Sequence, residues 1–92
     1  MEVKELKENT KVNDLILEIT ELGEPRETGN NVQILEGKGK DNKGEEVKIV
    51  FWREEVEGKE VGQKYLIKDG WCKSHLGNIQ CSAGKFGKWI EV

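Results

Sequence analysis

The chain has 92 residues, of which 35% are apolar and 36% charged, and its formal net charge is −3. A chain of this length forms one domain, residues 1–92, around a single core. No apolar run approaches the roughly 20 residues of a membrane span, and no secretory signal opens the chain, so we expect a cytoplasmic protein with no membrane partner.

The negative charge is concentrated in the N-terminal half of the chain. Residues 1–46 carry 12 acidic and 7 basic side chains, whereas residues 47–92 carry 6 acidic and 8 basic ones. Between Lys68 and Lys88 the sole acidic residue is Asp69. The C-terminal half can therefore present a mildly basic surface to a polyanion.

The first 40 residues predict an arm followed by two strands. We expect a helical turn or an irregular arm over 3–12, with Leu6 as a plug of the core. "DLILEITEL" then alternates as a strand, with three apolar side chains on one face: Leu15, Leu17 and Ile19. "GEPRETGN" interrupts the pattern, and a second strand covers about 31–40, where Gly37 and Gly39 indicate a bulge or strong coiling.

The third strand carries the first indication of function. "DNKG" at 41–44 is typical of a turn, and "EVKIVFW" at 46–52 alternates as a strand. One face holds Val47, Ile49 and Phe51, which leaves Trp52 beside Lys48 on the other. This placement of an indole next to a lysine on an outer face is the feature that an interpretation of the function has to explain. The next segment, 53–62, allows at most one helical turn.

The last two predicted strands, "QKYLIKDGWCKSH" and "NIQCSAGKF", flank the tight connection "HLGN". A hairpin symmetrical about Leu76–Gly77 brings together three pairs: Trp71 with Ser82, Cys72 with Cys81, and Lys73 with Gln80. The cysteine pair belongs to the core, so the other two pairs lie on the outer face. Tyr65 and Ile67 return to the core if the strand slips at a bulge over Asp69–Gly70.

Five strands with hardly any helix favour an all-β barrel, since closure removes the exposed edges. The third strand and the last hairpin carry a set of outer-face side chains suited to stacking and to phosphate contacts: Trp52, Trp71, Lys48, Lys73, Gln80 and Ser82. Nucleobases of a single strand stack on such rings regardless of sequence, and lysines hold the phosphates. The alternative is that both tryptophans cap or plug the barrel.

Three further positions, His75, Arg26 and Phe86, have two interpretations each. His75, in the connecting loop, either stacks on a base or is an ordinary loop residue. Arg26 either pairs with Glu24 or Glu27, which we favour, or contacts a phosphate. In "GKFGK", Lys85 and Lys88 are candidate phosphate contacts, Phe86 is a third stacking ring or a core residue, and Trp89 closes the barrel.

The sequence offers no constellation for catalysis or for a metal. Cys72 and Cys81 are too few for a zinc site, and two buried thiols are favoured over a cross-strand disulfide. The carboxylates are scattered over loops without a paired placement. We therefore expect no enzyme activity, no cofactor, no metal and no small-molecule substrate.

Four segments in this order resemble the OB-fold domains of archaeal replication protein A and of related archaeal single-stranded DNA-binding proteins: "LILEITELGEPRE", "DNKGEEVKIVFW", "VGQKYLIKDGW" and "GNIQCSAGKFGK". The resemblance covers about residues 6–90. This sequence differs from the family pattern in three ways: a short loop after Arg26, one extra residue between Gly44 and Trp52, and the lack of an acidic tail or further OB domains after Val92.

The resemblance implies a five-stranded OB barrel, with Trp52 and Trp71 as stacking rings. It places the family's third aromatic position at His75, its polar positions on the last strand at Gln80 and Ser82, and its arginine at Arg26. The implied function is sequence-tolerant binding of single-stranded DNA in replication, recombination or repair, at the nucleoid, by what can be one module of a longer protein. Two alternatives remain open: assembly with other OB-fold domains or replication and repair proteins, and binding of single-stranded RNA.

Overall fold

The computed structural model describes all 92 residues, Met1–Val92, and consists of strands, turns and two short 3₁₀ helices. The helices are η1 (Val3–Glu5) and η2 (Arg53–Val56). The strands are β1 (Thr10–Val12), β2 (Leu15–Leu22), β3 (Arg26–Glu27), β4 (Gln33–Lys40), β5 (Glu46–Trp52), β6 (Lys64–Lys68), β7 (Gly70–His75), β8 (Asn78–Ser82) and β9 (Lys88–Glu91). The structure contains no helix long and apolar enough to cross a membrane.

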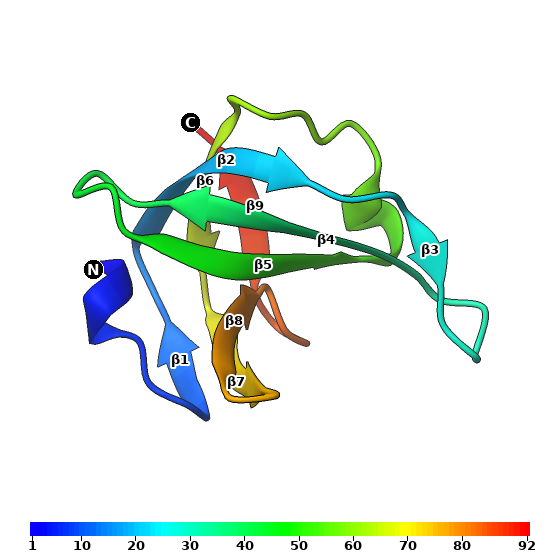
Figure 1. Ribbon diagram of the computed structural model, residues 1–92, viewed down its shortest axis with the longest axis horizontal. Helices are drawn as coiled ribbons and strands as arrows, with labels where there is room; N and C mark the ends of the chain where they lie inside the picture. The colour runs from blue at the N-terminus through cyan, green and yellow to red at the C-terminus, as the bar shows by residue number, and fades with distance from the viewer.

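The strands form one sheet in the order β1-β7-β8-β5-β4-β2-β6-β9, with β3 paired to β4. All neighbours are antiparallel except β5 and β8, which run parallel. β1 and β2 follow one another closely, as do β6 and β7, and they pair β1 with β7 and β2 with β6. The stretches β1–β2 and β6–β7 therefore pair with each other twice, once near each end of the strand order. As a result the sheet curls into a barrel-like shape (Figure 1).

The predicted all-β, barrel-like fold is confirmed. The five predicted strands correspond to β2, β4, β5, β6 with β7, and β8, and η2 is the short helical turn expected after the third of them. β1, β3 and β9 are additional. The last predicted strand ends at Ser82 and not at residue 86. It ends there because Gly84, two residues later, has a φ of +67°, which is not a strand conformation.

The core lies inside the curled sheet and is built from the inward side chains that the alternation predicts. Leu15, Leu17 and Ile19 of β2 are buried there, and Leu6 packs against them from the N-terminal arm. Trp89 of β9 lies 4.6 Å from the ring of Phe51, centroid to centroid, so it closes the core from the side, as predicted.

The hairpin of β7 and β8 has the predicted register in every pair. Trp71 faces Ser82, Cys72 faces Cys81 and Lys73 faces Gln80. Leu76 and Gly77 both have positive φ, which is the two-residue turn that matches the twist of a hairpin. Both cysteines are free and buried, in agreement with the favoured interpretation.

The predicted slip between β6 and β7 occurs at Asp69, whose φ is +52°. It reverses the side-chain alternation, so Tyr65 and Ile67 are buried while Trp71 is exposed. Gly70 is required next to it, because a Cβ there would lie 2.7 Å from the carbonyl oxygen of Ser82. The slip is therefore what allows one continuous stretch to supply both core residues and an outward indole.

Candidate nucleic-acid interface

Trp52 and Trp71 both lie on the outer face of the sheet and outside the core cluster. Their exposed fractions are 40% and 37%. Trp52 is the last residue of β5, and Trp71 is the second residue of β7, with β8 between the two strands. Trp52 lies opposite Ile34 of β4, which is buried although it too lies outside the core cluster.

A surface groove with a volume of about 1140 Å³ joins the two indoles. We call it the tryptophan groove. Six residues expected from the sequence to bind nucleic acid line it: Trp52, Trp71, Lys73, Ser82, Lys85 and Phe86. Phe86 has an exposed fraction of 89%, so of its two interpretations the core position is wrong and the ring is available at the surface.

Sequence reasoning missed two cations of this groove, Lys11 and Arg53. Lys11 belongs to β1, which is too short to show an alternating pattern, and it faces Trp71 directly across the β1–β7 pair. Arg53 follows Trp52 with a φ of +57°, a conformation that non-glycine residues adopt at some cost. In the sequence, the one indication that Arg53 belongs to the groove was its position next to Trp52.

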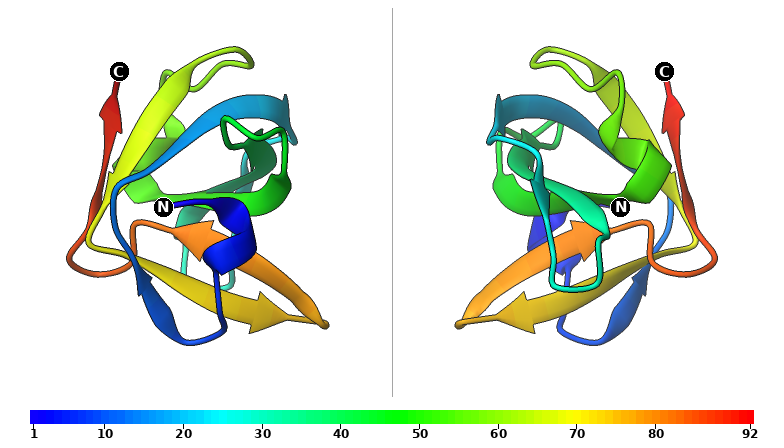
Figure 2. Two further views of the ribbon diagram at one scale, coloured as in Figure 1. Left: turned by 90° about the vertical axis from the view of Figure 1, so that its left-hand side faces the viewer. Right: turned by 90° about the vertical axis from the view of Figure 1, so that its right-hand side faces the viewer.

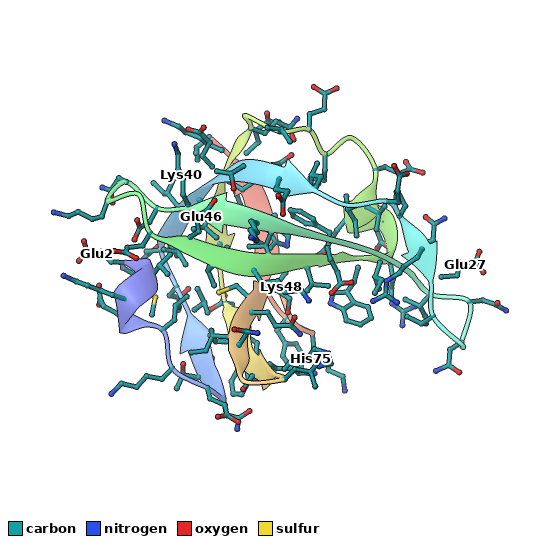
Figure 3. The ribbon with its side chains drawn as sticks, viewed as in Figure 1. Glu2, Glu27, Lys40, Glu46, Lys48 and His75 are labelled. Carbon is teal, nitrogen blue, oxygen red and sulfur yellow. The ribbon has the colours of Figure 1, made fainter.

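The remaining predicted site residues lie outside the groove. Lys48 and Gln80 are neighbours in the parallel β5–β8 pair, beside the groove. Lys48 lines a second, smaller hollow of about 790 Å³ that also includes Glu36 and Ile79. His75 is exposed next to the turn of the β7–β8 hairpin, where it faces Asn78, and Trp71 lies at the other end of the same hairpin. Figure 3 shows the positions of Lys48 and His75.

Arg26 pairs with neither Glu24 nor Glu27, and this prediction of its partner is wrong. Its Nη2 donates to Oε1 of Glu36 at 2.7 Å. The other carboxylate oxygen of Glu36 is 2.8 Å from Nζ of Lys48. The hydrogen bonds from Lys48 and then from Arg26 hold the pKa of the Glu36 carboxyl below its usual value. The partner was missed because β3 pairs with β4, which brings Arg26 beside a strand ten residues away.

The cations of the tryptophan groove are free, in contrast to Arg26 and Lys48. Lys11, Arg53, Lys73 and Lys85 are all exposed, and none of them forms an ion pair. Three acidic residues share the groove: Glu54, Glu55 and Asp69. The groove therefore carries a small excess of positive charge on a protein whose net charge is negative.

No group of three or more His, Cys, Asp or Glu side chains gathers in a way that could hold a metal ion. The exposed rings and free cations offer stacking and charge contacts, and no nucleophile is paired with a base among the groove residues. Comparison of the chain with protein-family models and with curated proteins found no significant match.

Proposed function

We propose that this protein binds single-stranded DNA in the tryptophan groove, with little preference for sequence, during replication, recombination or repair. The observation that carries the proposal is the presence of two exposed indoles in one groove with four unpaired cations. A nucleobase can stack on a partly exposed indole whatever its identity, because every base has a flat π-face.

The expected stacking energies and salt dependence favour a weak, salt-sensitive interaction for a single domain. Stacking of one base on an aromatic ring contributes about 1–3 kcal/mol, and two rings engage two bases. Each phosphate neutralised adds a salt dependence with a slope of about −0.7 for single strands. Additional domains of the same kind would strengthen binding through a higher effective concentration.

The topology supports an OB-type interface. In OB folds, the face of the second and third strands and the loops that follow the first and fourth strands bind oligonucleotides. Here these strands are β4 and β5, and the β7–β8 turn lies at the end of the hairpin that carries Trp71 and Lys73. Figure 2 shows this hairpin extending below the body of the barrel with β1 beside it.

A titration with oligo-dT of about a dozen nucleotides, followed by tryptophan emission, tests the proposal. Stacking quenches Trp52 and Trp71. Because Trp52→Ala with Trp71→Ala removes these reporter rings, its binding is followed by the anisotropy of labelled oligo-dT; we expect this variant to lose binding and to keep a cooperative thermal unfolding curve. Trp89→Phe is the matched control, because Trp89 packs on the core and lies outside the groove. Absence of quenching by oligo-dT in low salt contradicts the proposal.

The second candidate is a protein-binding module, which would join other OB-fold domains or replication and repair proteins. It is favoured by the net charge of −3 and by Leu76, whose side chain is almost fully exposed at the tip of the hairpin. The same titration separates the candidates, since a surface built for a protein leaves oligo-dT and oligo-U unbound. Equal quenching by oligo-U extends the proposal to RNA, because stacking does not read the 2′-hydroxyl.

A further inference from the structure

The positive charge of the tryptophan groove is gathered at the Trp71 end. Lys11 faces Trp71 across the β1–β7 pair, so both side chains lie on the same face of the sheet. Lys73 follows two residues after Trp71 and therefore points from the same face of β7. Both lysines are exposed and without an ion pair.

The loop after β8 brings a third lysine to this end. Gly84 lies against Trp71 so closely that a Cβ on it would be 3.2 Å from the Cβ of Trp71. The backbone N–H of Gly84 donates to Oγ of Ser82 at 3.2 Å, which fixes the start of the loop. Lys85 follows directly and lines the same groove, so three lysines without an ion pair come from backbone positions next to Trp71.

The Trp52 end has a different character because η2 begins at the next residue. Glu54 and Glu55 of this helical turn line the groove there, beside Arg53. Oε1 of Glu55 accepts a hydrogen bond from the backbone N–H of Trp52 at 2.9 Å, so the carboxylate is held beside the backbone of Trp52. Two carboxyl groups at this end repel a phosphate and a single arginine opposes them, whereas at the Trp71 end three lysines oppose the single carboxyl group of Asp69.

We infer that the sugar–phosphate backbone of the bound strand is held at the Trp71 end by Lys11, Lys73 and Lys85. At the Trp52 end the strand presents a base to the ring and directs its phosphates away from η2. This inference rests on the proposed function. It assigns a phosphate-binding role to Lys11 and denies one to Arg53, although both are free cations in the same groove.

The salt dependence of oligo-dT binding tests the assignment. Replacing one phosphate-binding lysine lowers the steepness of log K against log salt by about 0.7. We expect this change for K11Q and K85Q, and we expect K11R to keep the wild-type slope. K40Q is the remote control, because Lys40 pairs with Glu46 at the end of the β4–β5 pair six residues from Trp52 (Figure 3).

R53Q is the control that decides the inference, since it removes a free cation from the Trp52 end of the groove. We expect R53Q to keep the wild-type slope. A slope for R53Q that falls as far as that of K11Q, or a slope for K11Q equal to that of K40Q, overturns the inference. If the double indole variant still loses the binding of labelled oligo-dT in that case, the proposed function stands and only the phosphate path is wrong. Failure of the wild-type protein to bind rejects both.

Discussion

The carboxylate of Glu36 on β4 lies 2.8 Å from the ammonium nitrogen of Lys48 on β5. The same carboxylate accepts from Arg26 with its other oxygen. Glu36 therefore lies between two cations, in the space that a phosphate oxygen would take, and under the proposed function it keeps both of them from the bound strand. An acidic side chain that binds the cations of an interface competes with its anionic ligand.

We predict that Glu36→Gln strengthens oligo-dT binding about fivefold to tenfold at 50 mM salt and makes the salt dependence steeper, because Lys48 or Arg26 becomes free to meet a phosphate. The measurement is the same fluorescence titration at several salt concentrations. Glu21→Gln is the matched control, since it also removes one negative charge next to a lysine, Lys38, in the same smaller hollow, whereas Glu21 contacts neither Arg26 nor Lys48. If the two variants change oligo-dT affinity equally, Glu36 acts only through its negative charge and not through its contacts with Arg26 and Lys48.

A second prediction concerns the buried carboxylate of Asp41 in the β4–β5 turn. Burial raises its pKa, but backbone hydrogen bonds from Val3, Glu45 and Lys43 outweigh burial and hold the pKa below its usual value. A lowered pKa stabilises the fold above the unfolded-state pKa of about 3.9, and this stability is lost as the pH falls through the folded-state pKa.

We therefore expect Asp41→Asn to lower the free energy of unfolding by about 1–3 kcal/mol at pH 7, because the amide nitrogen faces a backbone donor. The difference from wild type shrinks as the pH falls below about 4. Urea unfolding between pH 7 and pH 2 measures both effects. Glu45→Gln, in the same turn but exposed, should leave the curve unchanged. A difference that is constant with pH would show that the Asp41 charge does not stabilise the turn.

The parts of the fold that the sequence predicts are those in which side-chain alternation and a short turn act together. The register of β7 and β8 followed from the two-residue turn and the core position of Cys81, and the slip at Asp69 followed from the conflict between Tyr65 and Trp71. β1 and β9 were missed because three or four residues do not establish an alternation.

The candidate site was predicted less completely, because two of its features depend on contacts between distant segments. Lys11 reaches the groove through the β1–β7 pair, which joins residues sixty positions apart. The ion pair of Arg26 with Glu36 depends on β3 pairing with β4. Local sequence around either residue carries no sign of its partner, whereas Trp52 and Trp71 were identified from their own strands.

A third prediction uses the two thiols of the hairpin as reporters of its rigidity. Burial raises the pKa of both Cys72 and Cys81, so neither forms the reactive thiolate at neutral pH. We expect the native protein to react with a disulfide reagent such as DTNB about a thousandfold more slowly than the protein in guanidinium chloride. Fast native reaction would mean that β7 and β8 separate, and that Trp71 is not held in a fixed groove.

The last prediction assigns a role to Phe86, whose ring is exposed at the tryptophan groove. An exposed ring contributes little to folding, so Phe86→Ala should leave the midpoint of thermal unfolding within about 2 °C of wild type. As a third stacking surface, however, it contributes about 1 kcal/mol to binding, and the variant should bind oligo-dT about fivefold more weakly.

The salt slope should stay unchanged for Phe86→Ala, because the ring carries no charge and stacking releases no counterion. Leu76→Ala is the matched control, since it truncates an equally exposed apolar side chain at the hairpin tip, outside the groove. Weakening by Phe86→Ala alone therefore identifies a contact made by the ring. Equal affinities of the two variants would place Phe86 outside the bound strand, and binding would then depend on Trp52 and Trp71 for all of its stacking.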